Sequence, residues 1–397
     1  MSTEQIRIAV VGAGIAGLTV AAALVRSGLR CDLFEQTRLL SEVGAGVQLA
    51  PNAARLLHRL EICERFREVA VRPQAIEMRR WDDNSVLRRT PLGAECEQLF
   101  GAPYYTVLRT DLQRSLLERL PGGTVHLGLH CTEVVERACD VELQFADGSS
   151  TTADVVIGAD GIHSRIRERL VRDEPRYSGQ NIYRALVPAD RLAFLCKEPK
   201  VVLWLGPGRH CVCYPVAGGQ QISLAATVPD PQWGAESWSA QGRTRDLTEA
   251  YSGWHPEVRA VTSAPDTIGR WALHDRELLR RWSTARITLV GDAAHPMLPF
   301  FAQGANQAIE DAVALAVCLR DTRRGEAGQI AAALARYERV RVPRTSEVHR
   351  ISQANTTALH LPDGLEQRRR DDALAAQAKL ADQEWIYGYD AEAAVAA

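Results

Sequence analysis

The chain has 397 residues, of which 46% are hydrophobic and 24% charged, as expected for an ordinary globular protein of two closely joined domains. Its formal net charge of −2 gives no electrostatic basis for a nucleic acid or an anionic membrane as partner, so we expect a small-molecule partner. The nine cysteines contain no C-x-x-C pair and the ten histidines form no ligand pattern, which argues against a disulfide framework or a metal site.

Residues 6–11 predict a buried parallel strand, and residues 18–27 predict a helix of small residues that ends near Gly28. The apolar stretch from 18 to 25 is much shorter than the roughly 20 residues that span a bilayer. The residues before it do not have the basic-then-apolar pattern of a signal peptide, so we expect none. We therefore expect a cytoplasmic protein with no membrane partner.

A glycine-rich loop, G-x-G-x-x-G, stands between this strand and this helix. Gly12 permits a tight turn, Gly14 lets the backbone approach a pyrophosphate, and Gly17 lets the helix pack closely on the sheet. Glu35 ends a second strand 18 residues after Gly17, where an acidic side chain binds a ribose hydroxyl. The pattern predicts a dinucleotide site, but by itself it fits NAD as well as FAD.

The middle of the chain contains more predicted strands than the first part. Strand-like pieces at 75–81 and 104–108 precede a helix at 111–120, for which Thr110 is a plausible N-cap. An alternating strand at 141–145, a turn at Asp147–Gly148 and an apolar strand at 153–158 follow. Strands separated by glycine and proline turns then predict an inserted antiparallel sheet between about 179 and 267, including 201–205, 210–216 and 222–228.

Two further motifs follow predicted strands. The first, Asp160-Gly161 with Ser164 behind it, alone fits any strand–turn–helix. The second runs from strand 287–290 into Gly-Asp292-Ala-Ala-His-Pro and then into a helix at about 303–320. Asp292 can accept hydrogen bonds from a ribityl chain, and the start of the helix stabilises an anion. Reduced flavin carries its negative charge on the pyrimidine edge, so this second motif favours FAD.

With the three motifs in this order, the chain resembles the group A FAD-dependent aromatic hydroxylases, the p-hydroxybenzoate hydroxylase family, over nearly its whole length. The resemblance implies an α/β fold with a Rossmann-like FAD-binding domain, an inserted antiparallel-sheet substrate domain and C-terminal helices. The expected FAD-binding domain comprises 1–72, 106–178 and 268–352, the substrate domain comprises 73–105 and 179–267, and the helical tail comprises 353–397.

The resemblance also implies roles for single residues. Glu35 would bind the adenosine ribose, Arg109 the FAD and Asp292 the ribityl chain, while Asp160 lies in the motif linked to both FAD and nicotinamide binding. Residues 44–48 would pass close to one side of the isoalloxazine ring. The full set expected at the cofactor is Gly12, Gly14, Ala16, Gly17, Glu35, Val47, Arg109, Asp160, Asp292, Pro296, Gln303, Gly304, Ala305 and Asn306.

The chemistry implied by the family uses NADH or NADPH to reduce the flavin and O2 to form a flavin C4a-hydroperoxide, which attacks an electron-rich ring. A phenol reacts best as its phenolate, so a base with a pKa near neutrality would help. His210 and Tyr214 share one face of a predicted strand, with α-carbons roughly 13 Å apart, and can flank one ring. We take them, with Gln48, as catalytic candidates; an ordinary sheet face is the alternative.

Within the family, the chain resembles 3-hydroxybenzoate 6-hydroxylase at Gln48, at the His210–Tyr214 spacing and at Asp275-Arg276. It resembles 6-hydroxynicotinate 3-monooxygenase at 159–164 and in the Trp-Ile-Tyr-Gly-Tyr-Asp tail, and salicylate hydroxylase is a third similar enzyme. We expect a substrate ring with a carboxylate and a hydroxyl or amino group. Phe300 and Phe301 either line its apolar wall or belong to the core.

Other functions stay open from the sequence alone. A FAD-dependent reductase or dehydrogenase would not activate oxygen, a redox sensor would not catalyse, and a hydroxylase of the salicylate or 6-hydroxynicotinate type would release CO2. Homodimers are common in the family, but the sequence shows no interface.

Overall fold

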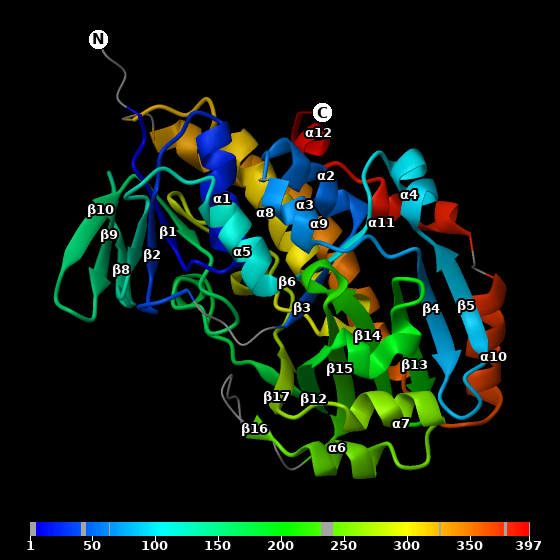
Figure 1. Ribbon diagram of the computed structural model, residues 1–397. Helices are drawn as coiled ribbons and strands as arrows, with labels where there is room; N and C mark the ends of the chain where they lie inside the picture. Colours follow the sequence, from blue (N-terminus) through cyan, green and yellow to red (C-terminus); the bar gives the residue numbers. More distant parts are fainter. Residues whose placement is uncertain are drawn as a thin grey trace.

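The structure is a computed structural model that describes residues 5–40, 45–62, 64–231, 241–324, 327–376 and 379–396. Figure 1 shows a parallel sheet with helices on one side of the molecule and a large, mainly antiparallel sheet on the other. The helices α8 (Gly304–Leu319) and α9 (Ala327–Ala358) run through the region between them. The α/β fold class predicted from the sequence is confirmed.

The parallel sheet carries the glycine loop. Its strands follow the order β18-β11-β1-β2-β7, and every neighbouring pair is parallel. The strands are β1 (Ile8–Val11), β2 (Asp32–Glu35), β7 (Val125–Leu127), β11 (Val155–Gly158) and β18 (Ile287–Leu289). The central strands are apolar throughout because both faces of such a sheet are covered.

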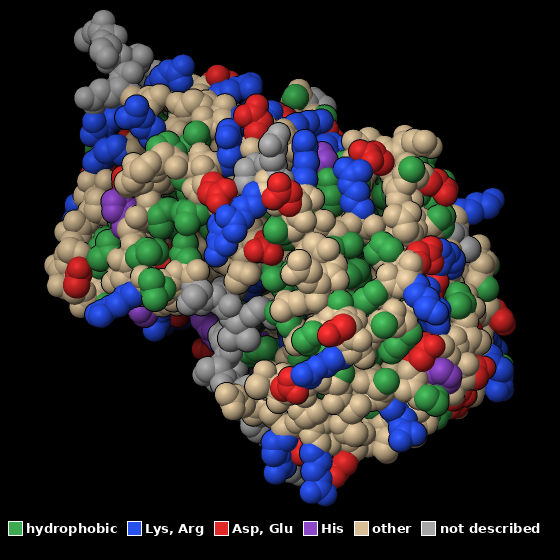
Figure 2. Space-filling model, in the orientation of Figure 1, with side chains coloured by type: hydrophobic (Ala, Val, Ile, Leu, Met, Phe, Trp, Pro, Cys, Tyr) green, Lys and Arg blue, Asp and Glu red, His purple; other side chains and the backbone are tan. Residues whose placement is uncertain are grey.

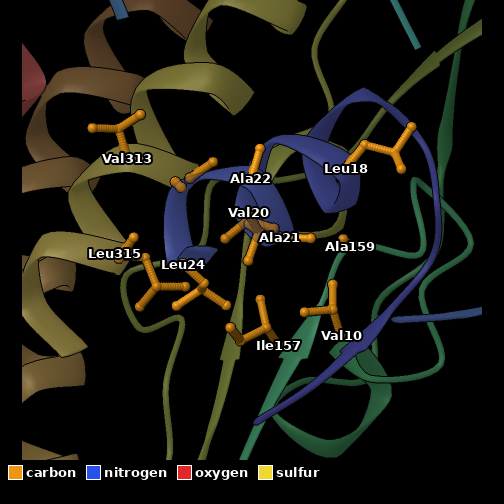
Figure 3. Close-up of a cluster of buried hydrophobic side chains, with 14 of the residues drawn as sticks. Val10, Leu18, Val20, Ala21, Ala22, Leu24, Ile157, Ala159, Val313 and Leu315 are labelled. Carbon is orange, nitrogen blue, oxygen red and sulfur yellow. The ribbon is translucent and has the colours of Figure 1, made fainter. Parts of the chain in front are cut away.

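Helix α1 (Ile15–Arg26) packs between this sheet and α8. Figure 3 shows Val10 and Ile157 on the sheet side of α1, and Val313 and Leu315 of α8 on its other side. Nine of the 12 residues of α1 are buried, so its small side chains fit a helix enclosed on several faces. This packing fixes the start of α1, and with it the glycine loop.

A separate antiparallel sheet contains β8 (Cys131–Glu136), β9 (Val141–Phe145) and β10 (Ser150–Ala153). The apolar strand expected over 153–158 is present but begins two residues later, because the chain leaves this sheet at Ala153 and enters the parallel sheet at Val155. Asp154 lies at the crossing, where its carboxylate accepts hydrogen bonds from the backbone N–H and the guanidinium of Arg7. This pair turns the chain between the two sheets.

The large sheet has the order β16-β17-β12-β15-β14-β13-β4-β5. Its strands are β4 (Ala75–Arg80), β5 (Val86–Pro91), β12 (Arg176–Pro188), β13 (Lys200–Gly206), β14 (Arg209–Val216), β15 (Gln221–Pro229), β16 (Gln241–Gly242) and β17 (Ile268–Asp275). Helices α6 (Thr244–Ala250) and α7 (Pro256–Ser263) cover one face. The other face is turned toward the parallel sheet and contributes to a cavity described below.

The remaining elements connect these layers. They are α2 (Pro51–Arg59), α3 (Glu64–Val69), α4 (Gly93–Phe100), α5 (Arg109–Leu117), the pair β3 (Gly46–Leu49) and β6 (Tyr105–Leu108), and the C-terminal helices α10 (Leu365–Ala376), α11 (Glu384–Tyr387) and α12 (Ala391–Ala396). Short 3-10 turns lie at 167–169, 189–195, 217–219, 291–293, 299–301 and 380–383. Helix α5 begins directly after β6, with Leu108 at the N-cap position, so the N-cap expected at Thr110 is wrong.

On the face drawn in Figure 2, positive and negative side chains alternate over the surface without a large area of one sign. Among the described residues, no helix combines the length and the apolar character that crossing a membrane requires.

Candidate active site

The glycine loop lies at the carboxyl ends of the parallel strands. Gly12 has a φ of 103°, which favours glycine, and a Cβ there would stand 2.5 Å from the carbonyl oxygen of Ala159. A Cβ on Gly17 would lie 1.8 Å from the carbonyl oxygen of Gly12. A Cβ on Gly14 would meet only Arg109, at 3.9 Å. The loop is therefore closed toward the protein and open at Gly14, as a backbone that approaches a pyrophosphate must be.

Glu35 stands at the end of β2, next to this loop. Its half-buried carboxylate accepts hydrogen bonds from the backbone N–H of Ala13 (2.7 Å) and of Thr37 (2.8 Å). The Glu35 carboxylate, which is expected to bind the ribose, is thus held at the loop. Its role in binding stays a prediction.

One cavity of about 390 Å³ joins the glycine loop to the large sheet. The predicted site residues that line it are Gly14, Ala16, Val47, Gln48, Arg109, His210, Tyr214, Asp292, Pro296, Gly304 and Ala305. The predicted residues that do not line it are Gly12, Gly17, Glu35, Asp160, Gln303 and Asn306. Gly44 falls outside the described residues.

The cavity suits FAD along its length. Asp292 follows β18, and its side chain is accessible from the cavity. Surrounding protein raises the pKa of this carboxyl, an effect that His295 and Arg109 oppose. Helix α8 begins at Gly304, and its first residues line the wall with no acidic side chain in the first turn. A pyrophosphate at the loop, a ribityl chain at Asp292 and an anionic ring edge at α8 therefore fit the donors and acceptors present.

The side chains of Asp160 and Asn306 form hydrogen bonds within the protein, and neither residue lines the cavity. The Asp160 carboxylate accepts hydrogen bonds from Ser164 Oγ (2.5 Å) and from the backbone N–H of Arg165 (2.7 Å), so it stabilises its own turn. The Asn306 side chain accepts from the backbone N–H of Ala50 (2.8 Å) and donates to the carbonyl oxygen of Gln48 (3.0 Å). Asn306 thereby holds β3 against the start of α8.

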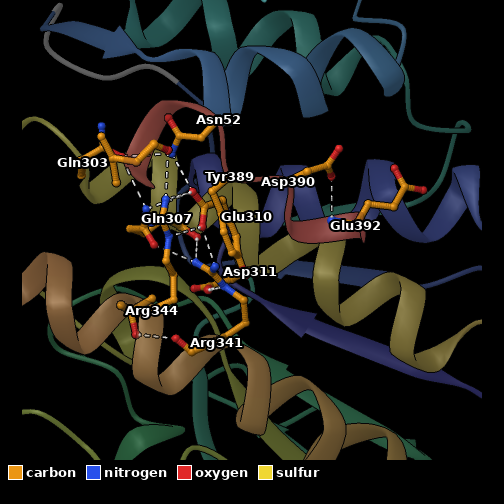
Figure 4. A network of polar contacts seen from close by, with 12 residues as sticks. Asn52, Gln303, Gln307, Glu310, Asp311, Arg341, Arg344, Tyr389, Asp390 and Glu392 are labelled. Atoms are coloured by element: carbon orange, nitrogen blue, oxygen red, sulfur yellow. Dashed lines mark hydrogen bonds and ion pairs between the residues drawn. The ribbon is translucent and has the colours of Figure 1, made fainter. Parts of the chain in front are cut away.

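A buried network of charges supports the wall that carries Asp292 (Figure 4). His295 Nε2 lies 2.6 Å from Asp311 Oδ2, and the same oxygen accepts from the backbone N–H of Gly291 at 3.0 Å. Arg341 of α9 contacts Asp311 at 2.8 Å and Glu310 at 2.5 Å. Burial raises the pKa of Asp311, but His295 and Arg341 outweigh it and hold that pKa below its usual value.

The network extends to the side chain that precedes α8. Asn52 donates to Gln303 Oε1 at 3.1 Å and to Glu310 Oε1 at 2.6 Å, and Gln307 lies among them (Figure 4). Gln303, predicted at the cofactor, therefore fixes the entry into α8 from within the protein.

His210 lies on the cavity face of β14 and is buried. Its Nδ1 lies 2.8 Å from His360 Nε2, the two rings stack with centroids 5.0 Å apart, and Thr227 Oγ1 lies 3.3 Å from the same Nδ1. Burial, together with His360, lowers the pKa of His210 well below 6.5. Burial lowers the pKa of His360 to about 4. Both imidazoles are therefore neutral at pH 7, and with Nδ1 engaged, Nε2 of His210 is left for a ligand.

Tyr214 occupies the other end of the same strand face. Burial raises the pKa of its phenol, while Ser223 and Arg184 oppose that rise, so its hydroxyl stays protonated at neutral pH. Gln48 Oε1 accepts a hydrogen bond from the Tyr104 hydroxyl at 2.8 Å. All three catalytic candidates thus line the cavity with fixed side chains.

Phe300 and Phe301 do not line this cavity. Phe300 is buried and packs edge-on against His210 and His360, with ring centroids 5.4 Å apart in both pairs. Phe301 stacks on Trp385 of α11. Of the two alternatives left open by the sequence, the structure shows core packing and no substrate wall, because the 3-10 turn at 299–301 directs these residues into the interior and toward the C-terminal helices.

Two residues of the site escaped the sequence reasoning. His360 lies 150 residues after His210 and belongs to no motif, so only the fold shows that they meet. Arg184 lies in the middle of β12 and lines the cavity. A lone arginine inside an apolar, strand-like run was a signal that the sequence did offer.

The buried histidines predict how stability depends on pH. Burial lowers the pKa of His58, His210, His349 and His360, whereas unfolded histidines titrate near 6.5. Below that pH the unfolded chain therefore binds more protons, and the free energy of unfolding falls as pH falls. His360 alone should cost on the order of 1 kcal/mol at about pH 5.5. Urea unfolding at about pH 7.5, 6.5 and 5.5 measures this, and equal stabilities at all three would contradict it.

Comparison with known proteins agrees with this geometry. A protein-family profile described as an FAD binding domain matches residues 5–352. A 3-amino-4-hydroxybenzoate 2-monooxygenase of Streptomyces platensis is 49% identical over 393 residues, which cover 98% of both chains. A 6-hydroxynicotinate 3-monooxygenase of Pseudomonas fluorescens is 38% identical, covering 89% of this chain and 92% of that one. A solved salicylate hydroxylase substrate complex has 32% identity and a TM-score of 0.84, covering 100% and 98%.

Proposed function

This chain belongs to the FAD-dependent aromatic monooxygenases, and we propose that it hydroxylates a benzoate-type acid bearing hydroxyl and amino groups, with 3-amino-4-hydroxybenzoate as the first substrate to test. The observation that carries this proposal is the cavity that joins the glycine loop and the start of α8 to the His210–Tyr214 face of the large sheet. An electron-rich ring placed between them would meet the flavin on one side and a proton acceptor on the other.

In the proposed reaction, the substrate, NAD(P)H, O2 and a proton give the hydroxylated acid, NAD(P)+ and water. Bound FAD supplies the electron transfer from NAD(P)H and the transfer of one oxygen atom to the ring. Neutral His210 accepts the phenol proton of the substrate at Nε2 in the tautomer in which its Nδ1–H donates to His360 Nε2. Tyr214 donates its hydroxyl proton to the ring substituents as a hydrogen bond. Asp292, Arg109 and the start of α8 would hold the flavin.

We further propose that the large sheet forms the substrate domain and that the enzyme acts in the cytoplasm. All eight cysteines that the structure describes are free thiols, which suits a reducing compartment.

One assay tests the function. The purified protein would be mixed with NADH or NADPH under air, with 3-amino-4-hydroxybenzoate, 3-hydroxybenzoate, 6-hydroxynicotinate or salicylate. We expect bound FAD, NAD(P)H and O2 consumption stimulated by one of these acids, and a hydroxylated product. Stimulated NAD(P)H oxidation that needs no O2 would instead identify a reductase. Release of CO2 with the product would identify a decarboxylating hydroxylase.

A further inference from the structure

Arg184 places a positive charge at the centre of the large sheet, on the face that lines the cavity. In the sheet register its neighbours are Ala225 on β15 and Gly269 on β17, two small residues that leave space beside its side chain. The indole of Trp271 extends over Gly269, and the Arg184 guanidinium lies 5.9 Å from that ring. The guanidinium is therefore held against an aromatic face while it remains open to the cavity.

This guanidinium has no acidic partner in the part of the chain that the structure describes, and its Nε is buried without a hydrogen bond. Burial lowers the pKa of Arg184, an effect that Tyr214 opposes and the like charge of Arg109 reinforces. The contrast with other buried arginines is sharp, because Arg341 contacts two carboxylates and Arg167 pairs with Asp173 at 2.7 Å. Arg184 is half-buried, and a desolvated charge without a counter-ion is destabilising, so Arg184 is maintained at a cost to stability.

The cavity provides no compensating charge near Arg184. Of the described residues that line it, Asp292 alone is acidic, and Asp292 lies beyond β18, outside the sheet that carries Arg184. The part of the cavity next to the large sheet, around Arg184 and His210, therefore carries a positive charge and contains no acidic side chain among the described residues. An anionic ligand would supply the missing partner through two parallel hydrogen bonds to the planar guanidinium.

The spacing on the sheet suits one aromatic ring. Arg184 aligns with Ala225, and Ala225 aligns with Val212, two residues from His210 on β14. Strands β12 and β14 are two strand spacings apart, and His210 lies two residues along β14 from Val212. The α-carbons of Arg184 and His210 are therefore about 12 Å apart. Both side chains extend into the cavity, so the gap between their polar ends is narrower.

We propose that Arg184 binds the carboxylate of the aromatic acid. The ring hydroxyl, at the opposite end of the substrate, is thereby placed next to His210. This inference rests on the proposed function, and it assigns the recognition of the acid group to one residue. The planar guanidinium lies beside the Trp271 ring and faces the cavity, where a carboxylate can reach it.

The test uses the FAD-loaded protein and two ligands that differ only in the acid group, 3-amino-4-hydroxybenzoate and its neutral amide. Dissociation constants would be read from the absorbance change of the bound flavin. We expect Arg184→Gln to weaken binding of the acid about 100-fold and binding of the amide only a few-fold. Arg184→Lys should keep part of the preference for the acid. Arg176→Gln, a control on the same strand where Arg176 pairs with Asp275 and Glu277, should keep all of it.

Stability without substrate provides a second readout. Removing an unpaired buried charge should leave the midpoint of thermal unfolding of Arg184→Gln equal to or above that of the native protein, whereas loss of a structural arginine would lower it. If Arg184→Gln keeps the full preference for the acid while the native protein hydroxylates its substrate, the role of Arg184 is overturned and the proposed function stands. A native protein that binds neither ligand and hydroxylates none of the four acids would overturn the proposed function as well.

Discussion

Replacing Arg341 with methionine is expected to lower the free energy of unfolding by about 3–5 kcal/mol. Arg341 is fully buried and contacts both Glu310 and Asp311, so its removal leaves two buried carboxylates with too little positive charge. Burial lowers the pKa of Arg341, but the two carboxylates outweigh it and raise that pKa above its usual value. Because Asp311 also holds Gly291 and His295, we expect FAD content to fall with stability.

Urea unfolding of the FAD-free protein measures this effect separately from cofactor binding. The matched control is Arg339→Met on the same helix, an exposed position at which the change should stay within about 0.5 kcal/mol. Adding Glu310→Gln to Arg341→Met should restore part of the loss, because it removes one of the two carboxylates that have lost a partner while Arg344 still faces the other end of that side chain. Equal stability of Arg341→Met and Arg339→Met would show that the network contributes nothing.

The cofactor half of the site was accessible from the sequence because it depends on local patterns. Gly12, Gly14 and Gly17 meet their requirements within one strand–loop–helix unit, and the Gly-Asp motif before α8 likewise lies within one short segment. Such motifs carry their geometry with them wherever they occur in the chain. The family and FAD followed from them, and both are confirmed.

The substrate half depends on contacts between distant segments, and there the sequence was less informative. Alternation on one strand correctly brought His210 and Tyr214 to one face, yet it could not show that His360 stacks on His210. The sequence also left open whether Phe300 lines the substrate site or belongs to the core, because spacing does not reveal where the turn before α8 directs its side chains. The division into domains and the individual site roles stay predictions.

Replacing His210 with alanine is expected to lower the rate of product formation about 100-fold at pH 7. The neutral imidazole would accept the phenol proton, and without it the ring reacts in its less electron-rich protonated form. His210 does not contact the glycine loop or Asp292, so FAD should stay bound. NAD(P)H oxidation should continue with a larger share of H2O2, which separates loss of the base from loss of the flavin.

The pH dependence distinguishes a base from a packing residue. Because burial holds the pKa of His210 well below 6.5, the native protein should show no loss of rate from His210 protonation between about pH 8 and 6.5. The rate of His210→Ala should instead rise with pH toward the native rate near about pH 10, where the substrate phenol ionises without help. Val212→Ala, a control on the same strand face, opens space without removing a base and should change the rate only a few-fold at any pH. If the rate of His210→Ala is lower than the native rate by the same factor at every pH, His210 shapes the cavity and does not accept a proton.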